Sequence, residues 1–331
     1  MVDGVIERTL TRGRVEDTIY RHTLSREGIT LRPRNESPPA TIRELIQKVG
    51  RRRSSPGPTD RDIVSDRDLE GLQGHFGSGL KKDVQKYFQG KIFPPINGRR
   101  PLALATRQHV LGHAIPQNSE RLGGPGDMPG VSPPIPDLLY GYRFRSFTPL
   151  QQDFLVEKGC GLQATRSQQY LPFFLVHFKG EGGISRVSTN ECMGGSACCV
   201  NITERLNRQV QACSSLPSAA RTPSVDGATF SMAVHNNFAR LFVTWQREDG
   251  IGYDVGRVRE FAFHNTTNYI ELRMYILNII DWGCGERLQQ VNAALDLLVA
   301  ESRQEATAAR KTREPPGVES GSSSSRKRLR R

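Results

Sequence analysis

Two short stretches decide the fold: residues 136–144 read PDLLYGYRF, and residues 171–179 read LPFFLVHFK. Both are rich in aromatic and branched apolar residues, which predicts a strand in each. The first stretch carries Asp137 at its start, and the second ends on His177 and Lys179. Because side chains in a strand alternate between the two faces of a sheet, we expect His177 and Lys179 on the same face.

The sequence around these stretches predicts the rest of an α/β fold. Small residues with helical spacing predict a helix over residues 188–212. Three further strands are expected at residues 229–234, 239–245 and 253–263, separated by the turn pairs Asn236-Asn237 and Asp249-Gly250. A long helical region over residues 268–303 is interrupted at Gly283-Cys284-Gly285. We therefore predict an α/β (α+β) fold with a mixed central sheet flanked by helices.

Changes in composition divide the chain into four parts. Residues 1–60 are a polar extension with one short amphipathic helix, and residues 61–122 form a helical lead-in. A loop with five prolines and four glycines, residues 123–136, opens the α/β core at residues 123–304. The last part, residues 305–331, is too polar to bury a core and is expected to be disordered.

Charge is concentrated at the carboxyl end of the sequence. The 331 residues carry a formal net charge of +12, which favours a polyanionic partner. The chain ends in a basic cluster that is typical of nuclear localisation or phosphate binding and consists of Arg326, Lys327, Arg328, Arg330 and Arg331. We therefore expect a nuclear protein that binds nucleic acid, DNA rather than RNA. We also expect the import machinery to bind its basic cluster.

The remaining composition favours a soluble intracellular protein. The six cysteines follow no secretory signal, so free thiols in a reducing compartment are expected. No apolar run approaches the roughly 18 to 20 residues that a membrane span needs. We therefore exclude insertion into a membrane.

The two deciding stretches also carry the residues for phosphodiester chemistry. Hydrolysis of a phosphodiester needs a divalent ion held by carboxylates and a nearby cation that stabilises the developing charge. Two neighbouring strands can supply the carboxylates and the cation. One begins with Pro-Asp137, and the other ends with an acid and a lysine two residues apart. Here the second strand has the lysine, Lys179, but His177 stands in place of the acid.

These features resemble the PD-(D/E)XK, or restriction-endonuclease-like, nuclease superfamily. The stretches PDLLYGY and PFFLVHFKG, followed by a small-residue helix that contains NITERLN at residues 201–207, look like an uncharacterised fungal branch of that superfamily. The resemblance covers roughly residues 136–303. It implies a restriction-endonuclease-like core and a function in nucleic-acid metabolism.

The resemblance also implies roles for individual residues. In that superfamily the Asp that opens the strand and the acid of the acid-x-Lys triplet hold Mg²⁺, and the Lys positions or activates the attacking water. By position, Asp137 is the first ligand, Lys179 is the lysine, and His177 replaces the second acid. Neutral imidazole suits Zn²⁺ or Mn²⁺ better than Mg²⁺ and adds no negative charge. Some members take the second acid from the following helix, which indicates Glu191, while Glu181 lies just past the strand and is another candidate.

These residues are compatible with three functions. The first is an active metal-dependent DNA or RNA endonuclease that uses Mg²⁺ or Mn²⁺ with Asp137, Lys179 and Glu191 or Glu181. The second, which we prefer because His177 replaces a ligand carboxylate, is a weakly active or non-catalytic nucleic-acid-associated descendant of the same fold. The third is a protein-interaction module in another pathway, with the tail as its only feature for nucleic acid.

Each candidate residue also has a purely structural interpretation. Asp137 can be the turn residue of a Pro-Asp pair, and Lys179 can be a solvent-facing lysine at a strand end. Glu191 can be an acid in the first part of a helix, where the helix dipole favours it.

Overall fold

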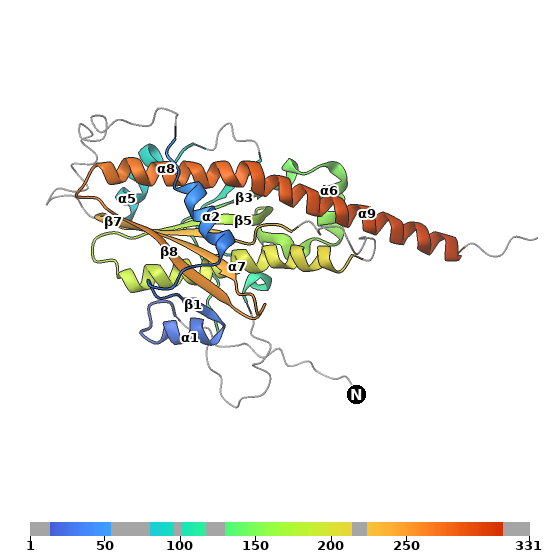
Figure 1. The fold of residues 1–331 in the computed structure, drawn as a ribbon, viewed down its shortest axis with the longest axis horizontal. Coiled ribbons are helices and arrows are strands. Elements are labelled where there is room, and N and C mark those ends of the chain that lie inside the picture. The colour runs from blue at the N-terminus through green and yellow to red at the C-terminus, as the bar shows by residue number, and fades with distance from the viewer. Residues whose placement is uncertain (1–13, 54–79, 96–100, 117–129, 214–223, 314–331) are drawn as a thin grey trace, which may run out of the picture.

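The computed structural model describes residues 14–53, 80–95, 101–116, 130–213 and 224–313. Within these ranges, eight strands form one mixed sheet with helices on both of its faces (Figure 1). The predicted α/β (α+β) class with a mixed central sheet flanked by helices is therefore confirmed.

The sheet combines long central strands with short strands near its edges. Its order is β1-β8-β7-β6-β5-β3-β2, and β4 pairs with β5. β5 runs antiparallel to β3 and parallel to β6, and β1 runs parallel to β8. In chain order the strands are β1 (Ile29–Leu31), β2 (Leu102–Ala105), β3 (Leu138–Arg143), β4 (Gln163–Thr165), β5 (Gln169–Phe178), β6 (Thr229–Val234), β7 (Phe238–Gln246) and β8 (Tyr253–Ala262).

Helices connect and cover these strands. The α-helices are α1 (Tyr20–Arg26), α2 (Ala40–Val49), α5 (Lys81–Tyr87), α6 (Pro149–Glu157), α7 (Ser185–Gln211), α8 (Thr267–Trp282) and α9 (Leu288–Arg313). Two π-helical segments, η1 (Phe88–Ile92) and η6 (Gly283–Arg287), continue α5 and join α8 to α9, and short 3-10 turns are η2 (Gly112–Ala114), η4 (Phe144–Ser146) and η5 (Cys160–Leu162). No helix in the described ranges has the length and apolar character needed to cross a membrane.

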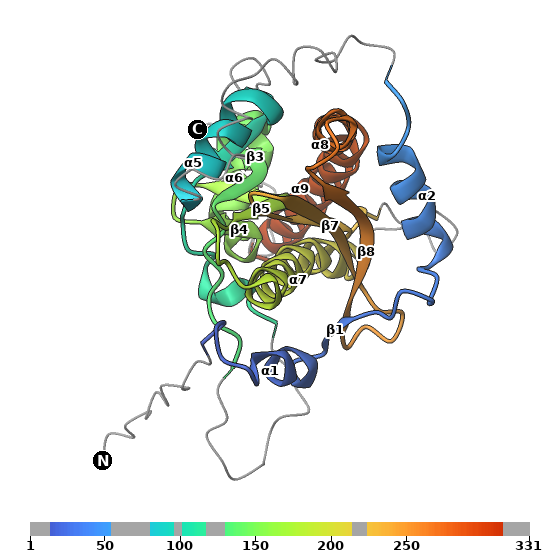
Figure 2. The same ribbon diagram turned by 90° about the vertical axis from the view of Figure 1, so that its left-hand side faces the viewer.

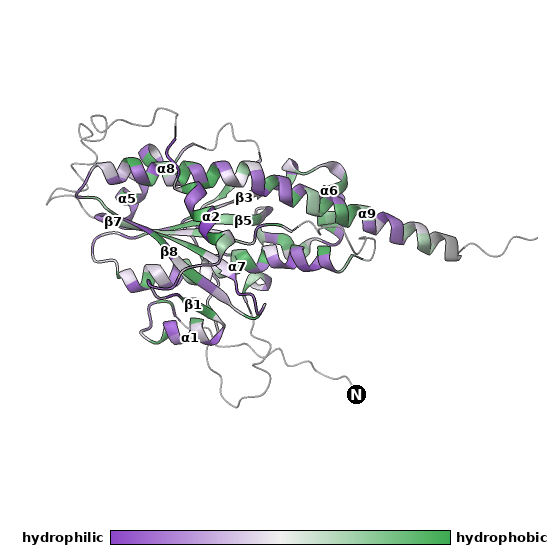
Figure 3. Cartoon of the chain, viewed as in Figure 1, coloured by the Kyte–Doolittle hydropathy of each residue, from purple (hydrophilic) through white to green (hydrophobic). Residues whose placement is uncertain are grey.

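Two layers of helices enclose the sheet. α7 lies along one face, and the continuous pair α8 and α9 lies over the other (Figures 1 and 2). Every residue of β5 is buried, and the strands at the centre of the molecule are largely hydrophobic in Figure 3. On the α7 side, Gly195 lies against Leu175, so its lack of a side chain lets this helix approach the sheet closely.

Aromatic side chains fill the space on the α8 side of β5. Phe174 and Phe178 of β5 pack against Phe93, and Phe174 also stacks on Tyr140 of β3, with ring centroids 5.3 Å apart. Phe88 of η1 packs against Phe178, so the helical segment before β2 is part of the same core. Burial of these rings, each among the largest apolar side chains, is a main contribution to stability on this side.

The sheet extends beyond the boundaries predicted for the core. β1 pairs with β8 and β2 pairs with β3, so the segments predicted as an extension and as a helical lead-in both supply strands. Each is only three or four residues long, which is too short for a clear alternating pattern. The first part of the predicted helical lead-in, residues 61–79, lies outside the described residues.

The disordered tail predicted from residue 305 was placed too early. α9 continues to Arg313, and residues 304–310, QEATAAR, are mostly strong helix formers. A helix that is already nucleated by packing can extend through such residues without burying them. Residues 314–331 lie outside the described residues.

The π-helical junction η6 gives a sensitive test of this packing. A Cβ at Gly283 would overlap the ring of Phe173, whereas a Cβ at Gly285, two residues further on, would meet open space. We expect Gly283→Ala to lower the free energy of unfolding by about 1–3 kcal/mol because it overpacks the core. The control Gly285→Ala should raise it by up to about 1 kcal/mol, since alanine favours helix. Urea unfolding of both variants measures the difference, and equal effects would contradict the described junction.

Candidate functional site

Asp137 lies at the entrance of β3, where the predicted Pro-Asp strand begins. Its side chain is only 2% exposed, and its Oδ2 accepts a hydrogen bond of 2.8 Å from the backbone N–H of Phe178. Its other oxygen, Oδ1, lies 2.7 Å from Nζ of Lys81, the first residue of α5. Both oxygens therefore have partners, one from the neighbouring strand and one from a helix earlier in the chain.

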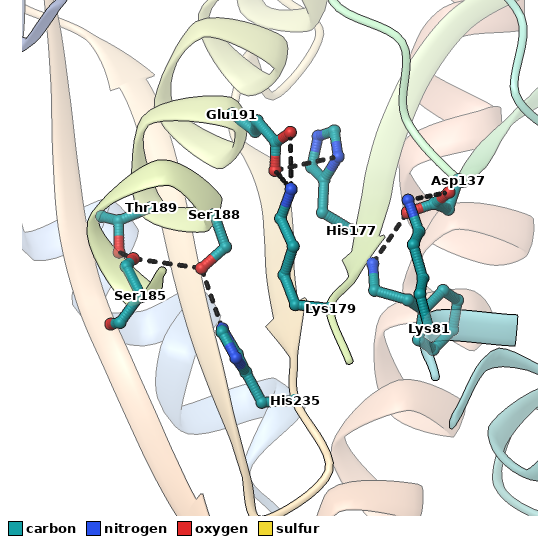
Figure 4. Close-up of polar contacts among 10 residues, drawn as sticks. Lys81, Asp137, His177, Lys179, Ser185, Ser188, Thr189, Glu191 and His235 are labelled. Carbon is teal, nitrogen blue, oxygen red and sulfur yellow. Dashed lines mark hydrogen bonds and ion pairs between the residues drawn. The ribbon is translucent and has the colours of Figure 1, made fainter. Parts of the chain in front are cut away.

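Lys179 and Glu191 form a second ion pair on the α7 side of β5. Nζ of Lys179 is 2.8 Å from Oε1 and 2.7 Å from Oε2 of Glu191, so the ammonium group bridges both carboxylate oxygens (Figure 4). The backbone of Lys179 is fixed as well, because its N–H donates to the carbonyl of Val234 in β6. The helix after β5 therefore places an acid beside the lysine.

His177 lies between the two ion pairs and is almost completely buried. Its Nδ1 is 3.8 Å from Oε2 of Glu191, too far for a hydrogen bond, and its Nε2 has no hydrogen-bond partner among the described residues. Burial lowers the pKa of His177, although the charges of Glu191 and Asp137 oppose the shift. The imidazole is therefore neutral near pH 7 and adds no charge to the site.

Glu181 is not part of this arrangement. It lies in an exposed turn between β5 and α7, and no contact joins it to Asp137 or Lys179 within the described structure. Of the two candidate acids, only Glu191 reaches Lys179. The basic cluster formed by Arg326, Lys327, Arg328, Arg330 and Arg331 lies outside the described residues.

Three residues near the site were not found from the sequence. Lys81 comes from a helix far away in the chain, and only the folded structure shows that it meets Asp137. His235 follows β6 directly, and Ser188 of α7 lies 3.0 Å from its Nε2 (Figure 4). The parallel pairing of Phe178 with Val234 could have indicated His235, because it places the next residues, Lys179 and His235, at the same edge.

Ser188 and His235 are hydrogen-bonded to each other, and both are almost completely buried. The Ser188 hydroxyl lies 3.0 Å from the carbonyl oxygen of Ser185 and 3.0 Å from Nε2 of His235, and its single proton can be donated to only one of them. A catalytic serine must also be accessible to its substrate, whereas Ser188 is only 1% exposed. His235 also stacks on Phe238, with centroids 4.3 Å apart, which fits a packing role.

The carboxylates of the site do not fit a divalent metal ion as they are arranged. Within the described ranges, no group of three or more His, Cys, Asp or Glu side chains is placed to hold a metal. Asp137 and Glu191 each face a lysine ammonium group instead, and Mg²⁺ needs oxygen ligands that are free to coordinate it. Each carboxylate is therefore compensated by the ammonium group of a lysine.

The environment of His235 predicts a pH dependence of stability. Burial, and after it the charges of Arg240 and Lys179, lower the pKa of His235 to about 4. The unfolded chain, with a histidine pKa of about 6.5, takes up a proton as the pH falls toward 4, whereas the folded chain does not. Folding stability is therefore lost over this window, by up to about 1.4 kcal/mol for each pH unit.

The variant His235→Asn removes this titration. We expect the stability advantage of the wild-type protein over the variant to shrink as the pH falls from 7 to 4. Urea unfolding of both proteins at several pH values measures the difference. A difference that stays constant over this range would contradict the described environment of His235.

Comparisons with curated proteins and with solved structures find no match. Residues 82–295 match the model of a family described as "Domain of unknown function (DUF7924)". The match begins in α5 and ends in α9, so it contains Asp137, His177, Lys179 and Glu191, whereas Lys81 lies just before it. Because the match covers well over half of the sequence, the chain belongs to the DUF7924 family.

Proposed function

We propose that this chain is a nuclear nucleic-acid-binding protein with a PD-(D/E)XK nuclease-like domain that cleaves its ligand weakly or not at all. One observation carries the proposal: lysines hold both carboxylates where the nuclease reaction needs a metal. Lys81 pairs with Asp137 at 2.7 Å, and Lys179 pairs with Glu191 at 2.7 Å. An ammonium group thus neutralises each acid.

The relation to the nuclease superfamily is supported by the placement of the motif residues. Asp137 opens a strand that pairs with the strand of His177 and Lys179, and Glu191 comes from the helix that follows. This is the arrangement that the resemblance implies, apart from the imidazole at position 177. The family description states no function, so the proposal rests on these residues.

The two ion pairs explain why cleavage should be weak. A metal ion at this site has to displace Lys81 from a carboxylate that is 2% exposed and whose other oxygen already accepts the N–H of Phe178. Lys179, the residue expected to position water, has its ammonium group against Glu191 instead. Both pairs have to open before water activation, and each opening leaves a charge poorly compensated.

Binding of a polyanion is compatible with the same geometry. The side chains of Lys81 and Lys179 are 43% and 19% exposed, so solvent reaches both cations although each has a carboxylate partner. The full chain carries a net charge of +12. Contacts to phosphates supply much of the affinity of nucleic-acid-binding proteins, and they need cations more than they need a metal site.

A second candidate function, an active metal-dependent nuclease, is favoured by the position of Glu191. This acid lies on the helix after β5 and touches Lys179, as it does in those superfamily members whose second acid has migrated to that helix. In that case Lys81 leaves Asp137 when the metal ion binds.

Binding and cleavage assays on the full chain distinguish the two functions. Labelled single- and double-stranded DNA and RNA are incubated with the wild-type protein in Mg²⁺, in Mn²⁺ and without metal, and products are separated on gels. We expect binding in every condition and little or no cleavage. Metal-dependent cleavage that disappears in both Asp137→Ala and Lys179→Ala would overturn the proposal in favour of the nuclease. Absence of binding to every nucleic acid would overturn both functions.

The basic cluster at the carboxyl end predicts a separate effect on localisation. Replacing Arg326, Lys327, Arg328, Arg330 and Arg331 by Gln should abolish accumulation of a fluorescent fusion in the nucleus, because import receptors bind such clusters through charge. The same variant should keep salt-dependent binding to DNA in solution, since cations of the folded domain still contact phosphates. Complete loss of binding would instead assign all nucleic-acid contacts to the tail.

A further inference from the structure

A cavity of about 580 Å³ lies along β8, away from the ion pairs of the candidate site. Its walls come from β7 and β8 on one side and from the segment between β1 and α2 on the other. β1 pairs with β8 only as far as Val255, so the following residues of β8 line this cavity on that edge while their other edge pairs with β7. In Figure 2 the chain leaves β1 and passes beside β8 on its way to α2.

Arginine is the most frequent residue in the lining of this cavity, which we call the arginine cavity. The cavity is lined by two glutamates, Glu36 and Glu260, against five arginines, namely Arg32, Arg34, Arg240, Arg257 and Arg259. Glu260 is shared, because it lies 3.6 Å from Arg34 and 3.2 Å from Arg240. Two of these arginines also pair with acids beside the lining, Arg32 with Asp254 and Arg259 with Glu271. Arg257 is therefore the arginine of the lining that has no ion pair among the described residues.

Arg257 is the arginine with the weakest compensation. Its guanidinium group donates to the backbone carbonyl of Arg32 at 3.1 Å, and no carboxylate lies within ion-pair distance of it among the described residues. Burial, and then the like charges of Arg34 and Arg240, lower the pKa of Arg257. Arg257 is nevertheless exposed, so an anion can reach it, and the like charges beside it favour an anion there.

Arg240 connects the cavity with the candidate site. It lines the cavity, and its guanidinium group also donates to the hydroxyl of Ser185, the first residue of α7. The guanidinium group of Arg240 also lies over the ring of Phe238, 4.6 Å from its centroid, and Phe238 stacks on His235. His235 directly follows Val234, whose carbonyl accepts the N–H of Lys179. Arg240 and Lys179 are therefore two cations on either side of His235.

We propose that the arginine cavity binds the phosphodiester backbone of a nucleic-acid strand, which continues past the beginning of α7 to the candidate site. This inference rests on the proposed function. Guanidinium groups bind phosphate oxygens through paired, charge-assisted hydrogen bonds. A strand with regularly spaced phosphates can contact the cavity and Lys179 together, whereas a single small anion can occupy only one of them.

An acidic peptide is the competing ligand, because guanidinium groups also bind carboxylates. The contact of Arg240 with Phe238 and His235, beside the ion pair of Lys179 and Glu191, favours nucleic acid, because it places the cavity next to the residues of the nuclease motif.

Binding of labelled single- and double-stranded DNA to the full chain tests the inference. We compare the wild-type protein with Arg257→Gln and with Arg34→Gln, whose side chain is 77% exposed, so that we expect its loss to leave folding intact. The control is Arg145→Gln, an exposed arginine of η4 outside the cavity. We expect each cavity variant to bind about three- to tenfold more weakly and to lose about one unit of the logarithmic salt dependence. The control should equal the wild type.

The outcomes separate this inference from the proposed function. If the wild-type protein binds DNA and both cavity variants bind with unchanged affinity and salt dependence, the cavity inference fails and the proposed function stands. If the wild-type protein binds no nucleic acid, both fail. A mononucleotide should compete only weakly with the labelled DNA. If polyglutamate competes as strongly as unlabelled DNA does, the choice of nucleic acid as the ligand is overturned.

Discussion

Complete burial of β5 is the constraint on which the rest of the structure depends. A strand with every side chain out of water needs a cover on both faces, and α7 supplies one cover while α8, α9 and η1 supply the other. Its neighbours β3, β4 and β6 pair with its backbone. The polar residues His177 and Lys179 appear only where this strand ends, and a charge at such a place needs a partner. Glu191 is that partner, because α7 has to begin beside the end of β5.

The parts of the fold with a clear periodicity could be predicted from the sequence. β6 has the bounds that its alternating residues indicate, and the glycines at 283 and 285 mark the junction of α8 and α9. β1 and β2 could not be predicted, because three or four residues carry no period and their pairing depends on distant strands. The end of α9 was misjudged because polar composition was given more weight than the helix propensity of Ala and Glu.

The residues of the candidate site also differ in whether they could be predicted from the sequence. Glu191 was accessible to sequence reasoning because the order of strand and helix restricts which acids can reach Lys179. Lys81 was not, since an ion pair between distant segments leaves no local pattern. Without Lys81, Asp137 resembles a metal ligand that lacks only its ion; with Lys81, it is a carboxylate whose charge is already balanced. The contact with Lys81 thus makes Asp137 one half of an ion pair instead of a free metal ligand.

The direction of α9 sets how far from the candidate site the chain after Arg313 begins. Its 26 residues, at about 1.5 Å each, form a rod of about 39 Å. In Figure 1 this rod projects past the sheet on the side opposite to the beginning of α7. Whatever follows Arg313 therefore starts at a distance from the candidate site. If both regions hold one polymer, they act as two tethered contacts, and release of either leaves the other at a high effective concentration for rebinding.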